Sequence, residues 1–345
     1  IEHAPSIDIN SIDKLSVIKG ASALQYAGDA VGGVIIAETS REKLVDDLYG
    51  SVTTNLQSNG RGGSVSTNFT KTNSNGWYYK FQGTLKRMGD FETADYVMTN
   101  TGFQENNISL KAGLNRIDHG FDIYYSLFSN QLGILRSSHA HTAIDIINAI
   151  NNEIPSVIEE FSYDINIPKQ KISHNLVKIK AFKNLNFGKL TMRYDYQVND
   201  RKEFDIRRGG RTGIPVVDLL LKTHTLNGSL SGIDIKNWNF ELGLSGFFQD
   251  NFSTPDTGVK RLIPDYIKFE TGIYFLGNFQ KSNAFLWEWG LRLDHVSYDS
   301  KKYYYKSVWN ERNYNILFKG FETGQDFANQ ILTNPKFNFL NVSAQ

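Results

Sequence analysis

Two runs of β-branched residues flank a centre of small residues in the stretch Ile12-Asp-Lys-Leu-Ser-Val-Ile-Lys-Gly-Ala-Ser-Ala-Leu-Gln-Tyr-Ala-Gly-Asp-Ala-Val-Gly-Gly-Val-Ile-Ile-Ala-Glu-Thr39. This pattern predicts a strand near residues 15–18, about a turn and a half of helix over 21–26, and a second strand over 31–37. Glycines stand where the chain must reverse, because only glycine takes a positive φ without steric cost. These glycines are Gly20, Gly28, Gly32 and Gly33. The stretch is therefore a compact unit and not a linker.

A nucleotide-binding glycine loop is the alternative interpretation of this stretch. Such loops need the spacing G-x-G-x-x-G or G-x-x-x-x-G-K-[ST] between a strand and a long helix. Neither spacing occurs between Ile12 and Thr39, so the residues argue against that alternative.

The stretch resembles the end of the plug domain of TonB-dependent outer-membrane receptors. The resemblance is carried by a basic residue and glycine, a helix ending in tyrosine, and a glycine pair before a β-branched strand. In this sequence those elements are Lys19-Gly20, Tyr26 and Gly32-Gly33-Val34-Ile35. The sequence departs from the family pattern at Ala21, where proline is common, and at Ala27, which separates Tyr26 from Gly28. The resemblance implies that residues 1–40 are the C-terminal part of an α+β plug domain.

Composition excludes several classes of protein. The chain has 345 residues, a formal net charge of +1 and no cysteine. The balanced charge gives no reason to expect a nucleic-acid partner, and the lack of cysteine excludes disulfides and thiolate metal sites. No run of about 18 apolar residues is present, which excludes a transmembrane helix. A membrane-spanning β-barrel stays possible, because its strands need only about 9 to 11 residues of alternating pattern.

From Leu44 onward the hydrophobic pattern has a period of two, and it predicts about twelve strands. In the clearest of them, Trp77, Tyr79, Phe81 and Leu85 share one face, opposite a polar face. The predicted strands are Leu44–Leu56, Arg61–Thr70, Trp77–Met88, Glu105–Asn115, Gly120–Phe128, Ser173–Phe182, Gly188–Val198, Val217–Ser231, Trp238–Gln249, Asp265–Phe279, Ala284–Tyr298 and Phe337–Ala344.

The connections between these strands alternate between short and long after the first hairpin. The long ones lie near 89–104, 129–172, 199–216, 250–264 and 299–336. Outer-membrane barrels have short periplasmic turns and long extracellular loops, and aromatic residues near the strand ends. A soluble β-sandwich also alternates along its strands but has no reason to alternate its loop lengths. We therefore predict an all-β membrane protein whose residues 44–345 form part of an antiparallel transmembrane β-barrel.

Plugged outer-membrane transporters have barrels of around 22 strands, so about twelve are too few to surround a plug. The sequence also begins close to the plug signature and ends at Gln345 without the terminal aromatic residue usual in the family. We expect the sequence to cover the end of the plug and the first part of the barrel.

No catalytic motif stands out, since neither H-E-x-x-H nor G-x-S-x-G occurs. We therefore expect no enzyme activity and no cofactor. His139 and His141 are weak candidates for metal ligands, because imidazole suits zinc, copper or iron but two histidines do not complete a tetrahedral site. Isoleucines at helical spacing after Thr142 predict a short helix that packs on the barrel mouth and stops before Pro155.

Two loops offer candidates for ligand binding. One places Arg201, Lys202, Arg207, Arg208 and Arg211 near the outer mouth, where guanidinium groups suit the oxygen atoms of an anionic ferric chelate. The alternatives are pairing with Glu203 and Asp205 in the same loop, or with anionic lipopolysaccharide. In the last long loop, aromatic side chains could stack on a ligand; they are Tyr303, Tyr304, Tyr305 and Trp309.

The family resemblance implies active import across the Gram-negative outer membrane, most simply of a ferric siderophore. Zinc, haem, cobalamin or glycan uptake remain open, as does a passive porin-like or adhesin-like barrel. The implied partners are a TonB-type energising protein that contacts an upstream segment, outer-membrane lipid and lipopolysaccharide, and the small-molecule or metal-chelate ligand. A surface lipoprotein over the barrel mouth is a further candidate partner.

Overall fold

A computed structural model describes most of the chain. The described residues are 6–28, 30, 32–39, 44–138, 143–152, 154–261, 263–282, 285–320, 322–327 and 330–345. The histidine pair proposed for metal binding, His139 and His141, lies outside them.

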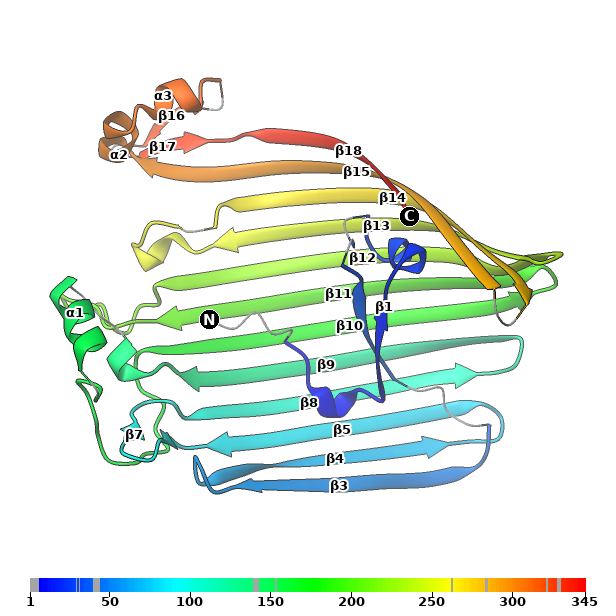
Figure 1. Ribbon diagram of the computed structural model, residues 1–345, viewed down its shortest axis with the longest axis horizontal. Coiled ribbons are helices and arrows are strands. Elements are labelled where there is room, and N and C mark those ends of the chain that lie inside the picture. Colours follow the sequence, from blue (N-terminus) through cyan, green and yellow to red (C-terminus); the bar gives the residue numbers. More distant parts are fainter. Residues whose placement is uncertain are drawn as a thin grey trace.

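One large antiparallel sheet dominates the described residues (Figure 1). Twelve of its strands pair with their neighbours in chain order, and each corresponds to one of the twelve predicted strands, which confirms the all-β fold. They are β3 (Asp47–Gln57), β4 (Gly62–Thr72), β5 (Trp77–Met88), β8 (Phe103–Asn115), β9 (His119–Gly133), β10 (Lys169–Leu185), β11 (Gly188–Phe204), β12 (Val217–Ile235), β13 (Trp238–Ser253), β14 (Asp265–Ser282), β15 (Phe285–Tyr305) and β18 (Lys336–Ala344).

Short turns and long loops gather at opposite ends of the sheet, as predicted (Figure 1). The long loops carry short elements of their own. These are β6 (Phe91–Glu92), β7 (Val97–Met98), η3 (Arg136–Ser138), α1 (Ala143–Asn151), η4 (Pro255–Thr257), α2 (Lys306–Glu311), α3 (Tyr314–Leu317), β16 (Glu322–Phe327) and β17 (Gln330–Thr333). No helix among the described residues is long and apolar enough to cross a membrane.

Several strands are longer than predicted and continue into the expected loops. Strand β11 runs to Phe204, where Arg201 pairs in register with Ile172 and Leu219. Arg201 is therefore a strand residue, and so are Tyr303, Tyr304 and Tyr305 at the end of β15. The reason is that ladder hydrogen bonds continue after the alternation of apolar residues has ended.

The isoleucine helix is present as α1, but the prediction that it packs on the barrel mouth is wrong. Ile144, Ile147 and Ile150 are 68%, 55% and 77% exposed. Helical spacing predicts the helix but carries no information about which surface its apolar side covers.

The sheet is buried on its polar face and exposed on its apolar face. Along β5, Gln82 and Thr84 are 4% and 2% exposed, whereas Phe81 and Leu85 between and beside them are 39% and 65% exposed. Aromatic side chains of the apolar face meet near the short-turn end, where Trp238 contacts the rings of Phe279 and Trp287. A soluble sandwich has the opposite arrangement, whereas a membrane barrel turns its apolar face to lipid and its polar face to the lumen.

The N-terminal segment, residues 6–39, lies on the polar face of the sheet (Figure 1). It contains η1 (Ile9–Ser11), β1 (Lys14–Ile18), η2 (Ala21–Gln25) and β2 (Val34–Glu38), and β1 pairs with β2 in antiparallel register. The predicted strand, helix and strand are confirmed, with two differences. The helix is a 3₁₀-helix, and the second strand is described from Val34 onward rather than from residue 31.

Candidate functional site

Two arginines of one long loop reach the next long loop at one end of the barrel. Arg207 donates a 2.8 Å hydrogen bond to the carbonyl oxygen of Thr257, and Arg211 approaches the same oxygen at 3.4 Å. Thr257 belongs to the loop between β13 and β14, so two of the predicted arginines join the β11–β12 loop to the next one. Gly258 leaves room for this contact, since a Cβ atom there would lie 2.1 Å from Arg211 Nη2.

The loop between β13 and β14 also reaches the end of β15. The guanidinium group of Arg261 lies 5.0 Å from the centroid of the Tyr303 ring, a cation–π distance. Its Nη1 atom is 2.5 Å from a carboxylate oxygen of Asp265. Arg261 was not predicted, although an oppositely charged residue four positions later is a local signal. We use the name rim for Arg207, Arg211, Thr257, Arg261 and Tyr303.

The other predicted ligand-binding residues do not join the rim contacts. Arg201 is paired with Glu203, with its Nε atom 2.9 Å from the carboxylate, as the alternative of local pairing predicts. Arg208 is exposed and makes no ion pair or hydrogen bond with the described residues. The Tyr304 ring packs against Trp309 and Phe318 at centroid distances of 5.5 and 5.6 Å, so it forms part of a loop core.

A buried arginine of the barrel wall holds the N-terminal segment. Arg292 on β15 is 2% exposed and its guanidinium group donates to both carboxylate oxygens of Asp294 at 2.9 and 2.8 Å. The same group donates to the carbonyl oxygen of Leu24 at 3.0 Å and to Ser245 Oγ at 2.8 Å. The charges of Arg292 and Asp294 are therefore paired inside the protein, and one further hydrogen bond from Arg292 holds the end of η2.

A second bond fixes the chain just after η2. Ser343 on β18 donates a 2.8 Å hydrogen bond from Oγ to the carbonyl oxygen of Gly28. A side chain at Gly28 has no space, because its Cβ atom would lie 2.4 Å from Asp294 Oδ2. We call Ser245, Arg292, Asp294 and Ser343 the seat of the N-terminal segment.

Further polar contacts join the N-terminal segment to β5 and β8, on the same face of the sheet but far from the seat. Gln82 Nε2 donates to Asp8 at 2.8 Å, Lys80 Nζ lies 3.0 Å from Asp13, and Lys111 Nζ donates to Thr39 at 2.7 Å. The N-terminal segment thus spans the polar face from β5 to β18, and polar side chains join it to the sheet at both edges.

The residues of the plug motif have different surroundings. Gly20 and Gly33 have positive φ values of +72° and +103°, and a Cβ atom at Gly33 would lie 2.6 Å from the carbonyl oxygen of Ile18. Gly32 is in open space, and Lys19 is exposed. Tyr26 points into the space between the segment and the sheet, where burial raises the pKa of its hydroxyl group.

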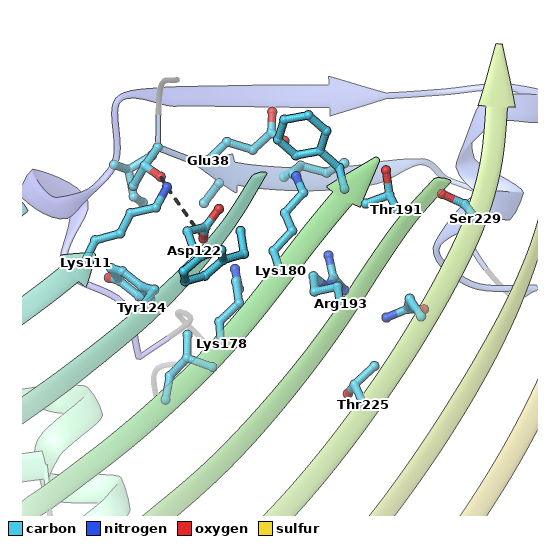
Figure 2. Close-up of a pocket in the computed structure, with 18 of the residues that line it drawn as sticks. Glu38, Lys111, Asp122, Tyr124, Lys178, Lys180, Thr191, Arg193, Thr225 and Ser229 are labelled. Carbon is cyan, nitrogen blue, oxygen red and sulfur yellow. Dashed lines mark hydrogen bonds and ion pairs between the residues drawn. The ribbon is translucent and has the colours of Figure 1, made fainter. Parts of the chain in front are cut away.

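A cavity of about 320 Å³ separates the N-terminal segment from strands β8 to β12 (Figure 2). Tyr26 and Glu38 line it on the side of the segment, and Lys111, Lys178 and Arg193 line it on the side of the sheet. No group of three or more histidine, aspartate, glutamate or cysteine residues that could hold a metal ion occurs in the described part of the chain.

No family model and no curated protein matches this sequence. Solved structures do match it. The copper transporter OprC is 14% identical with a TM-score of 0.66, and the match covers 96% of this chain and 47% of that one. The ferric yersiniabactin uptake receptor FyuA from Yersinia pestis is 12% identical with a TM-score of 0.64, covering 96% and 49%. The siderophore receptor PirA from Pseudomonas aeruginosa is 14% identical with a TM-score of 0.55, covering 84% and 46%.

These three proteins are TonB-dependent receptors, and this chain spans about half the length of each. At such low identity the likeness shows the fold. The chain has the antiparallel β-barrel fold of TonB-dependent receptors over part of their length.

Proposed function

We propose that this chain is part of an outer-membrane receptor that imports a scarce solute with energy from a TonB-type protein. The observation that carries the proposal is the N-terminal segment on the polar face of the barrel wall, held by Arg292 and Ser343. A passive porin needs an open lumen, whereas a segment fixed across the inner wall suits a pore that opens only when the segment is moved. Transport receptors of the same fold support the proposal.

The substrate that we propose is an anionic metal chelate, and a ferric siderophore is the first candidate. The rim gathers three guanidinium groups and one tyrosine ring on the side of the long loops, a set that suits carboxylate or catecholate oxygens. Zinc, haem, cobalamin and glycans are the alternatives. The similar structures include both a copper transporter and siderophore receptors, so they favour no single substrate.

The proposed surroundings follow from the same reasoning. The exposed apolar face would contact outer-membrane lipid, and the long loops would face lipopolysaccharide, the ligand and any surface lipoprotein. The TonB-type protein would act through a segment that precedes Ile1 in the family, and the N-terminal segment would be the end of the plug. We propose no enzymatic role.

Uptake by intact Gram-negative cells tests this function. Labelled ferric siderophores and labelled zinc would be supplied to the wild type, to a deletion of this gene and to a deletion of the energising protein. We expect uptake of one solute to disappear in both deletions. Uptake that persists without the energising protein but falls without this barrel would show a passive pore instead.

A further inference from the structure

The cavity beneath the N-terminal segment has an unusual row of charges on its barrel wall. Strand register places Asp122, Lys180, Arg193 and Asn227 side by side on β9, β10, β11 and β12. The next row inward, two residues along each strand, contains Tyr124, Lys178, Asp195 and Thr225. Figure 2 shows Asp122, Lys180 and Arg193 on adjacent strands, beside the segment that carries Glu38.

Lys180 and Arg193 are like charges directly opposite each other in register. Such cross-strand pairs destabilise a sheet unless another charge lies between them. The two nearby carboxylates form ion pairs with other atoms. Asp122 Oδ1 is 3.8 Å from Lys111 Nζ, and Asp195 Oδ2 is 2.8 Å from Arg193 Nε. The ammonium group of Lys180 makes no ion pair or hydrogen bond with any residue that the structure describes, and neither does the carboxylate of Glu38 on the opposite wall.

Two buried donors of the same row also lack acceptors. Arg193 Nε and Asn227 Nδ2 are inaccessible to solvent and form no hydrogen bond within the described residues. The 2.8 Å approach of Arg193 Nε to Asp195 is an ion pair whose angle does not make a hydrogen bond. Asp195 Oδ1 in the next row is also buried without a hydrogen bond, so it accepts from neither donor. A buried donor without an acceptor costs about 1–3 kcal/mol, so an acceptor placed between the two donors would be stabilising.

We propose that this cavity is a binding site for a small organic or inorganic oxyanion, which sits between Lys180, Arg193 and Asn227 on the barrel wall. Carboxylate or phosphate oxygens would accept from the guanidinium and amide groups and place negative charge between the two cations. The volume of about 320 Å³ fits a small solute. The site lies on the inner side of the N-terminal segment and shares no residue with the rim.

Binding of citrate and of inorganic phosphate to the purified full-length protein tests the site. Isothermal titration calorimetry in detergent at low ionic strength would compare the wild type with Lys180→Gln and Arg193→Gln. We expect one of the two anions to bind the wild type, and its affinity to fall about tenfold or more in each variant, as for the loss of a hydrogen bond to a charged group. The matched control is Lys183→Gln, which removes the same charge from an exposed position of the same strand and should leave the affinity unchanged.

Stability provides a readout that does not depend on transport. Lys180 has no partner to lose, so Lys180→Gln should fold and, in the absence of anions, should melt at the same temperature as the wild type or higher. The anion should raise the melting temperature of the wild type and not that of Lys180→Gln, because a ligand stabilises only the state that binds it. Lys180→Glu should remove anion binding too, since its carboxylate would supply the missing charge opposite Arg193.

The proposal is overturned if neither anion binds the wild type, or if Lys183→Gln weakens binding as much as Lys180→Gln. These outcomes are separate from those of the uptake experiment. If the anion binds but no solute is taken up, the anion-binding proposal holds and the import proposal fails. If no anion binds, the proposal of TonB-dependent import is not affected.

Discussion

The seat and the rim both use arginine, but they use it in opposite ways. At the seat, Arg292 is 2% exposed and its guanidinium group has a hydrogen-bond acceptor on every side. At the rim, Arg207 and Arg211 share one carbonyl oxygen, that of Thr257, and are partly or largely exposed. A group with every donor satisfied holds one partner in one position, whereas a group with spare donors can accept a partner from solution. The comparison assigns a fixed contact to the seat and a variable one to the rim.

The largest expected effect is at the seat. Arg292→Ala would leave Asp294 buried without its cation, and breaking a buried pair in this way costs about 3–5 kcal/mol. Because the chain has no cysteine, a single cysteine in place of Ala23, which is fully buried, would report release of the N-terminal segment. We expect its maleimide labelling rate to rise roughly 100-fold or more.

The double variant Arg292→Ala/Asp294→Ala separates charge from packing. Removing both partners of a buried pair costs less than removing one, so labelling of the cysteine should slow again relative to the single variant. Equal labelling rates in the two variants would show that Asp294 carries no buried charge at the seat.

The next effect is at the rim and concerns binding rather than stability. The double variant Arg207→Ala/Arg211→Ala should weaken uptake affinity for an anionic chelate by about tenfold, as expected for the loss of charge-assisted hydrogen bonds. The maleimide labelling rate of the cysteine at position 23 should not change. Arg116→Ala, which removes a positive charge from a short turn at the opposite end of the sheet, is the control, and a similar loss of affinity there would refute a local role of the rim.

A smaller effect is expected from the backbone beside the rim. Gly258 has a φ of +61° and no space for a Cβ atom next to Arg211, so Gly258→Ala should cost about 1–2 kcal/mol of local backbone strain and displace the guanidinium group. We expect a few-fold loss of uptake affinity. Gly213→Ala in the neighbouring loop meets nothing within 4 Å and should behave like the wild type.

The smallest effect lies outside both regions, at a short turn. The backbone N–H of Ser74 donates to Asp46, and this bond lowers the pKa of the exposed Asp46 carboxyl group below its usual value. The contribution of Asp46 to stability is therefore present above the pKa of the unfolded chain and is lost as the pH falls through the lower folded value. Thermal melts of Asp46→Ala and the wild type should differ slightly at pH 7 and coincide near pH 2, and a difference that persists in acid would contradict this explanation.

Local patterns were sufficient to predict the strands but not the seat. Alternation and turn residues predicted all twelve barrel strands, because each strand has one apolar face whatever it pairs with. The same patterns placed Arg201 and Tyr303 in loops, since ladder pairing continues beyond the apolar stretch. The sequence around Arg292 did not predict its contact with the N-terminal segment, because its partner Leu24 is 268 positions away.

The candidate site was predicted in part. Arg207 and Arg211 contact Thr257, and Tyr303 lies beside Arg261 of the same loop; their role in ligand binding stays a prediction. The cationic row behind the N-terminal segment was not predicted, because Lys180 and Arg193 become neighbours only through strand register. A charge pattern along one strand does not show which charge it will face.

The bond from Ser343 to Gly28 has a consequence for the order in which the molecule is assembled. It joins positions 315 residues apart, and translation makes Gly28 long before β15 and β18 exist. The N-terminal segment precedes the barrel strands, yet β18 contributes to its docking place, and contacts between such distant positions form slowly. The contacts of the segment with Arg292 and Ser343 can therefore form only once β15 and β18 are in place, so docking of the segment would report completion of this part of the barrel.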